Sequence, residues 1–167
     1  MKLLTFSAFA LLLLATLIAC GGQTNSTEDT NAAAAPGKFT SEEMAAQQQL
    51  WDKVMKLHDE VMPKTTAINQ LSKNLKTQWE TNKNLDAATK DDISIAIQEL
   101  ESADEGMFAW MHDLKKLEPL RESESHQGIL NYLQEQEQSM ILIREEMDNS
   151  LAKADSLLKK IMVNVEQ

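Results

Sequence analysis

The sequence predicts an all-α protein: an up-down-up antiparallel three-helix bundle that follows a signal peptide and a disordered tether. Between residues 38 and 167 there are only two glycines and two prolines, so the turn residues that usually bound β-strands are scarce. Apolar residues instead recur every three or four positions, which is the spacing of one face of a helix. Charged residues make up 25% of the chain. Those that lie between the apolar positions form the solvent-facing sides of the helices.

The first helix is predicted from about Ser41 to Asn84. Thr40 precedes it and Glu43 follows three residues later, which is the pattern of a capping box. The apolar stripe of this helix consists of Met44, Trp51, Val54, Val61, Ile68, Leu75 and Trp79. The stripe predicts that one face of the helix is buried along its whole length.

Pro63 interrupts this first helix. Proline lacks a backbone N–H and clashes with the carbonyl group four residues earlier, here that of Asp59, so we expect a kink. A complete reversal of the chain at Pro63 would give a four-helix bundle instead. We favour the kink, because no turn residues lie between Met62 and Lys64.

Two further helices complete the predicted bundle. The second begins after Thr89 and is expected to end at Pro119, and its stripe consists of Ile93, Ile97, Leu100, Asp104, Met107, Met111 and Leu114. The third starts near Ser123 and runs nearly to the C-terminus, with a stripe of Ile129, Leu133, Met140, Ile143, Met147, Ala154, Leu157 and Ile161. Short connections near residues 87 and 120 make consecutive helices antiparallel.

Residues 1–19 have the features of a secretory signal peptide. Lys2 is followed by an apolar run that is interrupted by only three hydroxyl residues and is shorter than a typical membrane-spanning helix. The run ends in Leu17-Ile18-Ala19-Cys20, which resembles the lipobox of bacterial lipoproteins. This resemblance implies cleavage before Cys20 and attachment of acyl chains to that residue. An ordinary cleaved signal with a free Cys20 and a short membrane helix are the alternatives.

Composition and charge define the rest of the chain. Residues 20–40 are rich in Gly, Ser, Thr, Asn and Ala and are predicted to form a flexible linker, and residues 41–167 form the helical domain. The net charge of −10 makes the protein repel nucleic acid and anionic lipid. A single cysteine excludes a disulfide scaffold and a multi-cysteine metal site within the chain. We therefore expect no nucleic-acid partner and a membrane contact made by the N-terminal lipid.

Histidine and methionine residues suggest a metal site. In an antiparallel bundle, residues equally far before and after a short turn lie at the same height, and we use this reflection about the two turns to estimate which residues are level. It places three histidines and four methionines in one layer of the bundle: His58, His112, His126, Met55, Met62, Met107 and Met111. Imidazole and thioether groups together suit Cu(I). The hypothesis is a copper-type site formed by His58, Met62, Met107, Met111 and His112, with Trp110 beside it. The alternative is that the methionines fill the core and the histidines are structural or exposed, with no cofactor.

Asp104 is an acidic residue on an otherwise apolar stripe. A buried carboxylate requires a partner. Reflection places it level with Glu137 and with Asn69 or Gln70, and the nearest cations by height are Lys73 and Arg144. A polar layer that fixes the helix register explains Asp104 better than acid–base or di-iron chemistry, because the Glu-x-x-His motif of di-iron bundles is absent from the sequence.

Motifs of catalysis are also missing from the sequence. It contains no glycine-rich phosphate loop, no His-Glu-x-x-His and no Gly-x-Ser-x-Gly. It also lacks a haem attachment motif, which disfavours a haem held by the same histidine and methionine residues. We therefore expect a protein that is not an enzyme.

Two stretches of the helical domain resemble a known family. They are Trp51–Lys64 and Ala103–His112, and they are similar to small bacterial lipoproteins that often carry the label "viral A-type inclusion protein". The resemblance implies lipid attachment and a helical body, and it implies no activity.

The sequence therefore predicts a lipid-anchored protein of the bacterial cell envelope, facing the periplasm, with the choice of inner or outer membrane left open. Its acidic helical bundle is expected to act as an interaction or structural module for one or more protein partners. The alternative function is a metal-binding bundle of the copper type.

Overall fold

The structure is a computed structural model that describes residues 37–165, with side chains described as far as Val163. This part of the chain is all-α and contains no β-strand. It has five helices: α1 (Ser41–Val61), α2 (Lys64–Thr81), α3 (Ala87–Asp113), α4 (Leu117–Ser123) and α5 (His126–Val165). The sequence predicts three long helices, whereas the structure has four long helices and the short α4.

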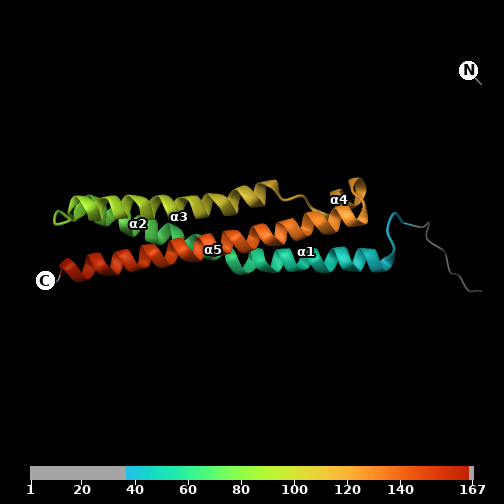
Figure 1. The fold of residues 1–167 in the computed structure, drawn as a ribbon, viewed down its shortest axis with the longest axis horizontal. Coiled ribbons are helices and arrows are strands. Elements are labelled where there is room, and N and C mark those ends of the chain that lie inside the picture. The colour runs from blue at the N-terminus through green and yellow to red at the C-terminus, as the bar shows by residue number, and fades with distance from the viewer. Residues whose placement is uncertain (1–36, 166–167) are drawn as a thin grey trace, which may run out of the picture. The chain divides into compact units, whose positions relative to one another are not determined.

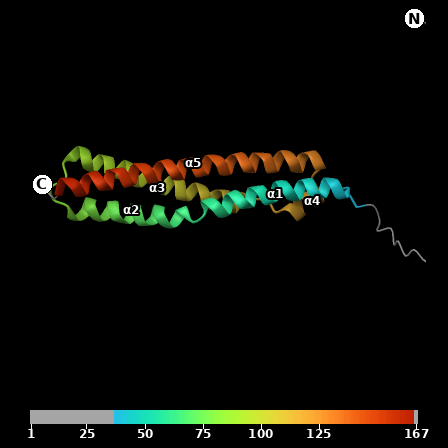
Figure 2. The same ribbon diagram turned by 90° about the horizontal axis from the view of Figure 1, so that it is seen from below.

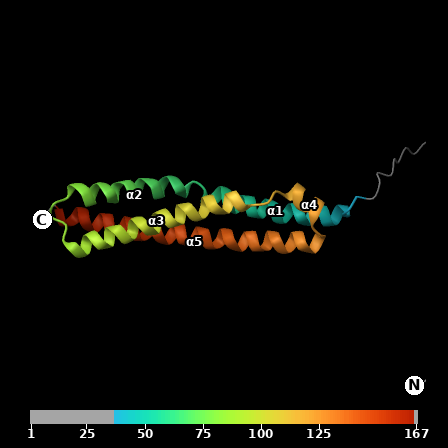
Figure 3. The same ribbon diagram turned by 90° about the horizontal axis from the view of Figure 1, so that it is seen from above.

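The helices lie along a common direction (Figure 1). Helix α2 continues in the direction of α1, α3 returns beside α2, and α5 runs first along α1 and then along α2, with α3 also beside it. Figures 2 and 3 show α2, α3 and α5 side by side in one half of the described unit, with α1, α5 and α4 in the other. Helix α5 therefore packs against every other helix.

The predicted break at Pro63 is present, and it does not reverse the chain. Met62 and Pro63 both keep right-handed helical backbone angles. The amide of Thr65 donates to the carbonyl of Met62, and that of Thr66 donates to the carbonyl of Pro63. These bonds span three residues instead of four, so the turn is locally tightened into a 3₁₀ form. A proline that cannot donate to Asp59 explains the interruption.

Helix α4 is the element that the sequence analysis missed. Pro119 was expected to end the second helix, but α3 already ends at Asp113 and Pro119 lies in the first turn of α4. The expectation was wrong because a proline is tolerated in the first turn, where its missing N–H has no partner within the helix. Lys115 lies between α3 and α4, and its amide donates a hydrogen bond of 2.7 Å to the hydroxyl of Tyr132 in α5.

Capping residues fix the helix ends. The capping box of Thr40 and Glu43 is confirmed at the start of α1. Asp86 caps α3 by accepting from the amide of Thr89 at 2.7 Å, so α3 begins at Ala87, slightly earlier than predicted. The hydrogen bond from the amide of Thr40 lowers the pKa of Glu43, and hydrogen bonds from the side chain and then the amide of Thr89 lower the pKa of Asp86.

A seven-residue spacing runs through the core. Its fully buried members include Val54, Val61, Ile68 and Leu75 of α1 and α2, Ile93, Leu100 and Met107 of α3, and Leu133, Met140, Met147, Ala154 and Ile161 of α5. A spacing of seven residues is the pattern of helices that supercoil around one another with a left-handed twist. A second cluster joins Leu117 and Leu120 of α4 to Ile129 and Leu133.

Three residues of the predicted stripes are more exposed than expected. Met44 is 45% exposed, Trp79 is 48% exposed and Met111 is 37% exposed. Met44 and Trp79 share a heptad position with Thr65 and Ser72, which are buried in the middle of the same line. The two exposed residues lie at the two ends of that line, close to the start of α1 and the end of α2.

Helices α1 and α5 are parallel and in register. Lys53 of α1 pairs with Glu137 of α5 at 2.7 Å, Lys64 at the start of α2 pairs with Asp148 of α5, and the Nζ atom of Lys38, just before α1, donates to the carbonyl oxygen of Glu122 in α4 at 2.9 Å. Each of these pairs is separated by 84 residues, a whole number of heptads. The segment formed by α1 and α2 and the segment formed by α4 and α5 therefore keep the same heptad phase over their shared length.

Candidate functional site

His58 and Trp110 form an aromatic pair between α1 and α3. Their ring centroids are 5.7 Å apart and the ring planes differ by 25°, so the rings are stacked. The Nδ1 atom of His58 lies 2.9 Å from Oδ1 of Asp59, which is strongly exposed. Trp110 is only 8% exposed, and its Nε1 atom is buried without a hydrogen-bond partner among the described residues. A buried N–H group without an acceptor is unusual.

Two of the predicted methionine ligands belong to the same layer. Met62 follows His58 by four residues, so it lies one turn further along the same face of α1. Met107 precedes Trp110 by three residues on α3, which runs in the opposite direction. Since His58 is level with Trp110, Met62 and Met107 are level with each other. Met107 is fully buried in the main core cluster, and the partly buried Met62 packs against that cluster.

The other predicted ligands are placed differently. Met111 is the residue after Trp110 and is partly exposed, and the neighbouring His112 is exposed. His126 lies 3.2 Å from Gln47, which is eleven residues before His58 on α1 and hence about 16 Å away along the helix. The prediction that all three histidines share one layer is therefore wrong, because α4 lengthens the connection between α3 and α5 and shifts the reflection.

A buried polar network holds α4 against α1. Gln47 is fully buried, and its Oε1 accepts from Nε of Arg121 at 2.9 Å. Arg121 also donates to the backbone carbonyl of Met44 at 3.1 Å. Because Arg121 can only donate, the amide nitrogen of Gln47 points to Nδ1 of His126, which must accept. This network was not predicted from the sequence, although a glutamine on the heptad line of Val54 is a signal that could have indicated it.

Asp104 lies in a partly polar layer between α3 and α2. Burial raises the pKa of its carboxyl group, the side chain of Asn69 opposes the rise, and the charge of Glu105 adds to it. The Oδ1 atom is buried without a hydrogen-bond partner among residues 37–165. The predicted neighbour Asn69 is present. Ion pairs with Lys73 or Arg144 are not found in the described part of the chain, where each described pair involves other residues.

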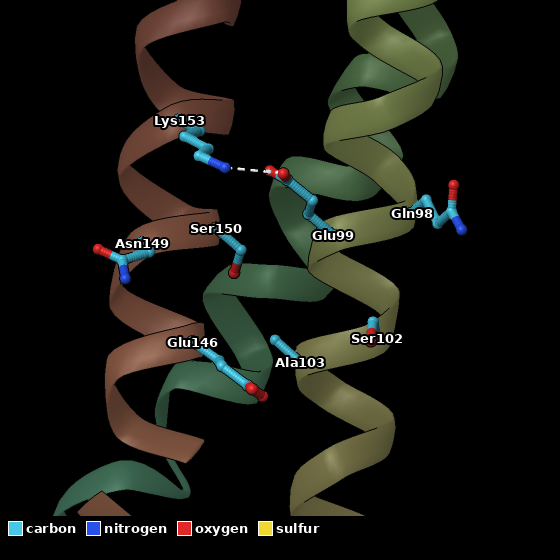
Figure 4. Close-up of a pocket in the computed structure, with 8 residues that line it drawn as sticks. All are labelled: Gln98, Glu99, Ser102, Ala103, Glu146, Asn149, Ser150 and Lys153. Carbon is cyan, nitrogen blue, oxygen red and sulfur yellow. Dashed lines mark hydrogen bonds and ion pairs between the residues drawn. The ribbon is translucent and has the colours of Figure 1, made fainter. Parts of the chain in front are cut away.

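A shallow groove runs between α3 and α5. Figure 4 shows Lys153 of α5 meeting Glu99 of α3 across it, with their charged atoms 2.7 Å apart. Small residues, Ala103 and Ser150, lie in the space between the helices, and Glu146 reaches into it from α5. The hollow has a volume of about 350 Å³, and a second hollow of about 390 Å³ continues along the same two helices and shares Glu99 and Lys153. This groove was not predicted from the sequence.

Among the described residues, no three His, Cys, Asp or Glu side chains gather in a way that could hold a metal ion. No helix in residues 37–165 is both long and apolar enough to cross a membrane. Cys20 lies outside the described residues. Comparisons with family models, with curated proteins and with solved structures found no match to this chain.

Proposed function

We propose that this protein is a bacterial lipoprotein of the cell envelope, anchored through Cys20, whose helical bundle is an interaction module facing the periplasm. The observation that carries the proposal is the sequence Leu17-Ile18-Ala19-Cys20 at the end of a basic and then apolar leader. Two or three acyl chains on one residue give stable membrane attachment, because a single chain binds only marginally. The choice between inner and outer membrane stays open.

The bundle has features that suit a module held away from the membrane surface. In this proposal α1 and α2 act as one kinked rod, α3 is the second and α5 the third, which gives the up-down-up arrangement expected from the sequence. The net charge of −10 repels anionic headgroups. The linker of residues 20–40 separates the acylated cysteine from α1.

Metabolic labelling tests the anchor. Cells that express the full-length chain are fed radiolabelled palmitate, and the labelled protein is compared with the Cys20→Ser variant. We expect label in the wild type and none in the variant, together with retention of the wild type in the membrane fraction. Equal labelling of the two proteins, or no label in either, would contradict the proposal.

The α3–α5 groove is the proposed contact surface. It is open, it follows two helices, and its small residues Ala103 and Ser150 let another backbone approach closely, so it suits a helical segment of a protein partner better than a compact metabolite. A photo-crosslinking amino acid at Ser102, on the rim of the groove, is expected to give an adduct in intact cells. The same group at Thr77, on α2, is the control. Equal adducts at both positions, or none at Ser102, would contradict this surface.

A further inference from the structure

We propose that the layer around His58 binds one soft monovalent metal ion, Cu(I), through Nε2 of His58 and the thioether sulfurs of Met62 and Met107, with the indole ring of Trp110 against the ion. The site selects three of the five ligands that the sequence suggested and leaves out Met111 and His112. It does not depend on the lipid anchor.

His58 has the arrangement of a metal-binding histidine. Its Nδ1 is 2.9 Å from a carboxylate oxygen of Asp59. Histidines that ligate metals usually donate their second ring nitrogen to such a carboxylate, which fixes the tautomer and the ring orientation. With the proton on Nδ1, Nε2 carries the lone pair on the side of the ring away from Asp59. The side chain is 17% exposed, so an ion can reach it from solvent.

The two methionines supply soft donors at the same height. Met62 is one helical turn from His58, and Met107 is one turn from Trp110 on the antiparallel α3. The stacking of His58 on Trp110 fixes the relative height of the two helices, so Met62 and Met107 lie on the same side of the aromatic pair along the bundle. Thioether ligands favour the soft Cu(I) ion over the hard Mg²⁺ and Ca²⁺ ions.

Trp110 provides an independent observation. More than nine-tenths of this residue is buried, yet its Nε1 has no acceptor among the described residues. A cation near the face of an indole ring is attracted by the ring quadrupole, most strongly where water is excluded. Because the indole N–H can only donate, the ring face of Trp110, and not Nε1, is the part that would lie against the ion.

The test is a titration of the full-length chain in detergent with Cu(I), set against a competing Cu(I) chelator of known affinity. The Cys20→Ser background removes a thiol that would itself bind the ion. We expect one equivalent of Cu(I) to bind, and Trp fluorescence to fall as it does. Silver(I), which does not change oxidation state under these conditions, is expected to give the same stoichiometry.

Matched variants assign the ligands. Met62→Leu and Met107→Leu keep apolar volume, and each is expected to weaken binding about tenfold or more, whereas Met162→Leu, at an exposed methionine, leaves it unchanged. Asp59→Asn changes an exposed side chain and is also expected to weaken binding about tenfold. Trp110→Phe is expected to retain the ion and to lose most of the fluorescence response.

The thermal unfolding of each variant is followed by circular dichroism, so that loss of binding is separated from loss of the fold. No bound ion in the Cys20→Ser protein would overturn the proposal. Equal affinity in a folded Met62→Leu variant, or an equal loss of affinity in Met162→Leu, would overturn it as well. Palmitate labelling of Cys20 is unaffected by any of these outcomes, so the two proposals fail separately.

Discussion

Gln47 shows how one polar residue specifies the contact between distant parts of the chain. It occupies a buried heptad position, and its amide is held by Arg121, 74 residues away, and by His126, 79 residues away. A hydrophobic residue at this position would pack without preferring one neighbour over another. The directional amide instead requires α4 and the start of α5 to lie at one level of α1.

Arg121→Ala is expected to destabilise the protein by about 1–3 kcal/mol, because Oε1 of Gln47 is left buried without its donor. Urea unfolding followed by circular dichroism measures the change. The Gln47→Met, Arg121→Met double variant should recover much of the loss, since it removes both partners. Lys159→Ala breaks an exposed ion pair and serves as the control. If Arg121→Ala lowers the free energy of unfolding no more than Lys159→Ala does, the network contributes little to stability.

Asp104→Asn is expected to change how stability depends on pH. Burial raises the pKa of Asp104 above its ordinary value of 3.8, so the neutral carboxyl is the form that the fold prefers. The stability gained from protonation is complete below that value and is lost as pH rises through the folded-state pKa. The variant should therefore melt a few degrees higher than the wild type at pH 7 and equally at pH 3.5. A difference that is the same at both pH values would contradict this explanation.

At the scale of the helix, the sequence was most informative where the apolar period was long. The capping box at Thr40, the break at Pro63 and the extent of α5 could all be predicted, because each depends on local chemistry. Helix α4 could not, since its seven residues give too few turns for a period to be seen. That one missed element also displaced His126 from the layer of His58, because the height of a residue depends on every connection before it.

Pro63→Ala is expected to stabilise the protein by about 2 kcal/mol. The amide of an alanine at this position can donate to the carbonyl of Asp59. A proline in a helix interior costs about 3 kcal/mol, because it lacks this hydrogen bond and clashes with that carbonyl. The substitution also loses about 0.4–1 kcal/mol, because alanine makes the unfolded chain more flexible. The helical backbone angles of Pro63 are already suitable for alanine. Differential scanning calorimetry gives the melting temperature, and a lower value than that of the wild type would mean that the 3₁₀ turn is required for packing.

The whole bundle combines an apolar core of constant heptad phase with a surface of excess negative charge. The candidate metal layer illustrates what sequence reasoning can reach at this scale. His58, Met62, Met107 and the nearby Trp110 could be chosen from residue type and spacing, whereas the stacking of His58 on Trp110 required the helices to be placed side by side and the contact of His58 with Asp59 required the side chains. The groove between α3 and α5 was beyond prediction for the same reason.

Added salt is expected to raise the melting temperature. The ion pairs described on the bundle are mainly exposed and each contributes little, so screening them costs little. Repulsion within a chain of net charge −10 is screened at the same time. Melting in 20 mM and 500 mM NaCl, followed by circular dichroism, measures the balance. A fall in melting temperature at high salt would mean that the cross-helix pairs outweigh the repulsion.

The parallel register of α1 and α5 has a practical consequence for labelling. Both helices start at one end of the bundle. Helix α5 has forty residues, so its last turn lies about 60 Å from its first turn. A fluorophore introduced near Val163 and another near Thr40 would thus report on opposite ends of the bundle. Paired probes of this kind would reveal which pole a binding partner occupies, whatever holds Cys20.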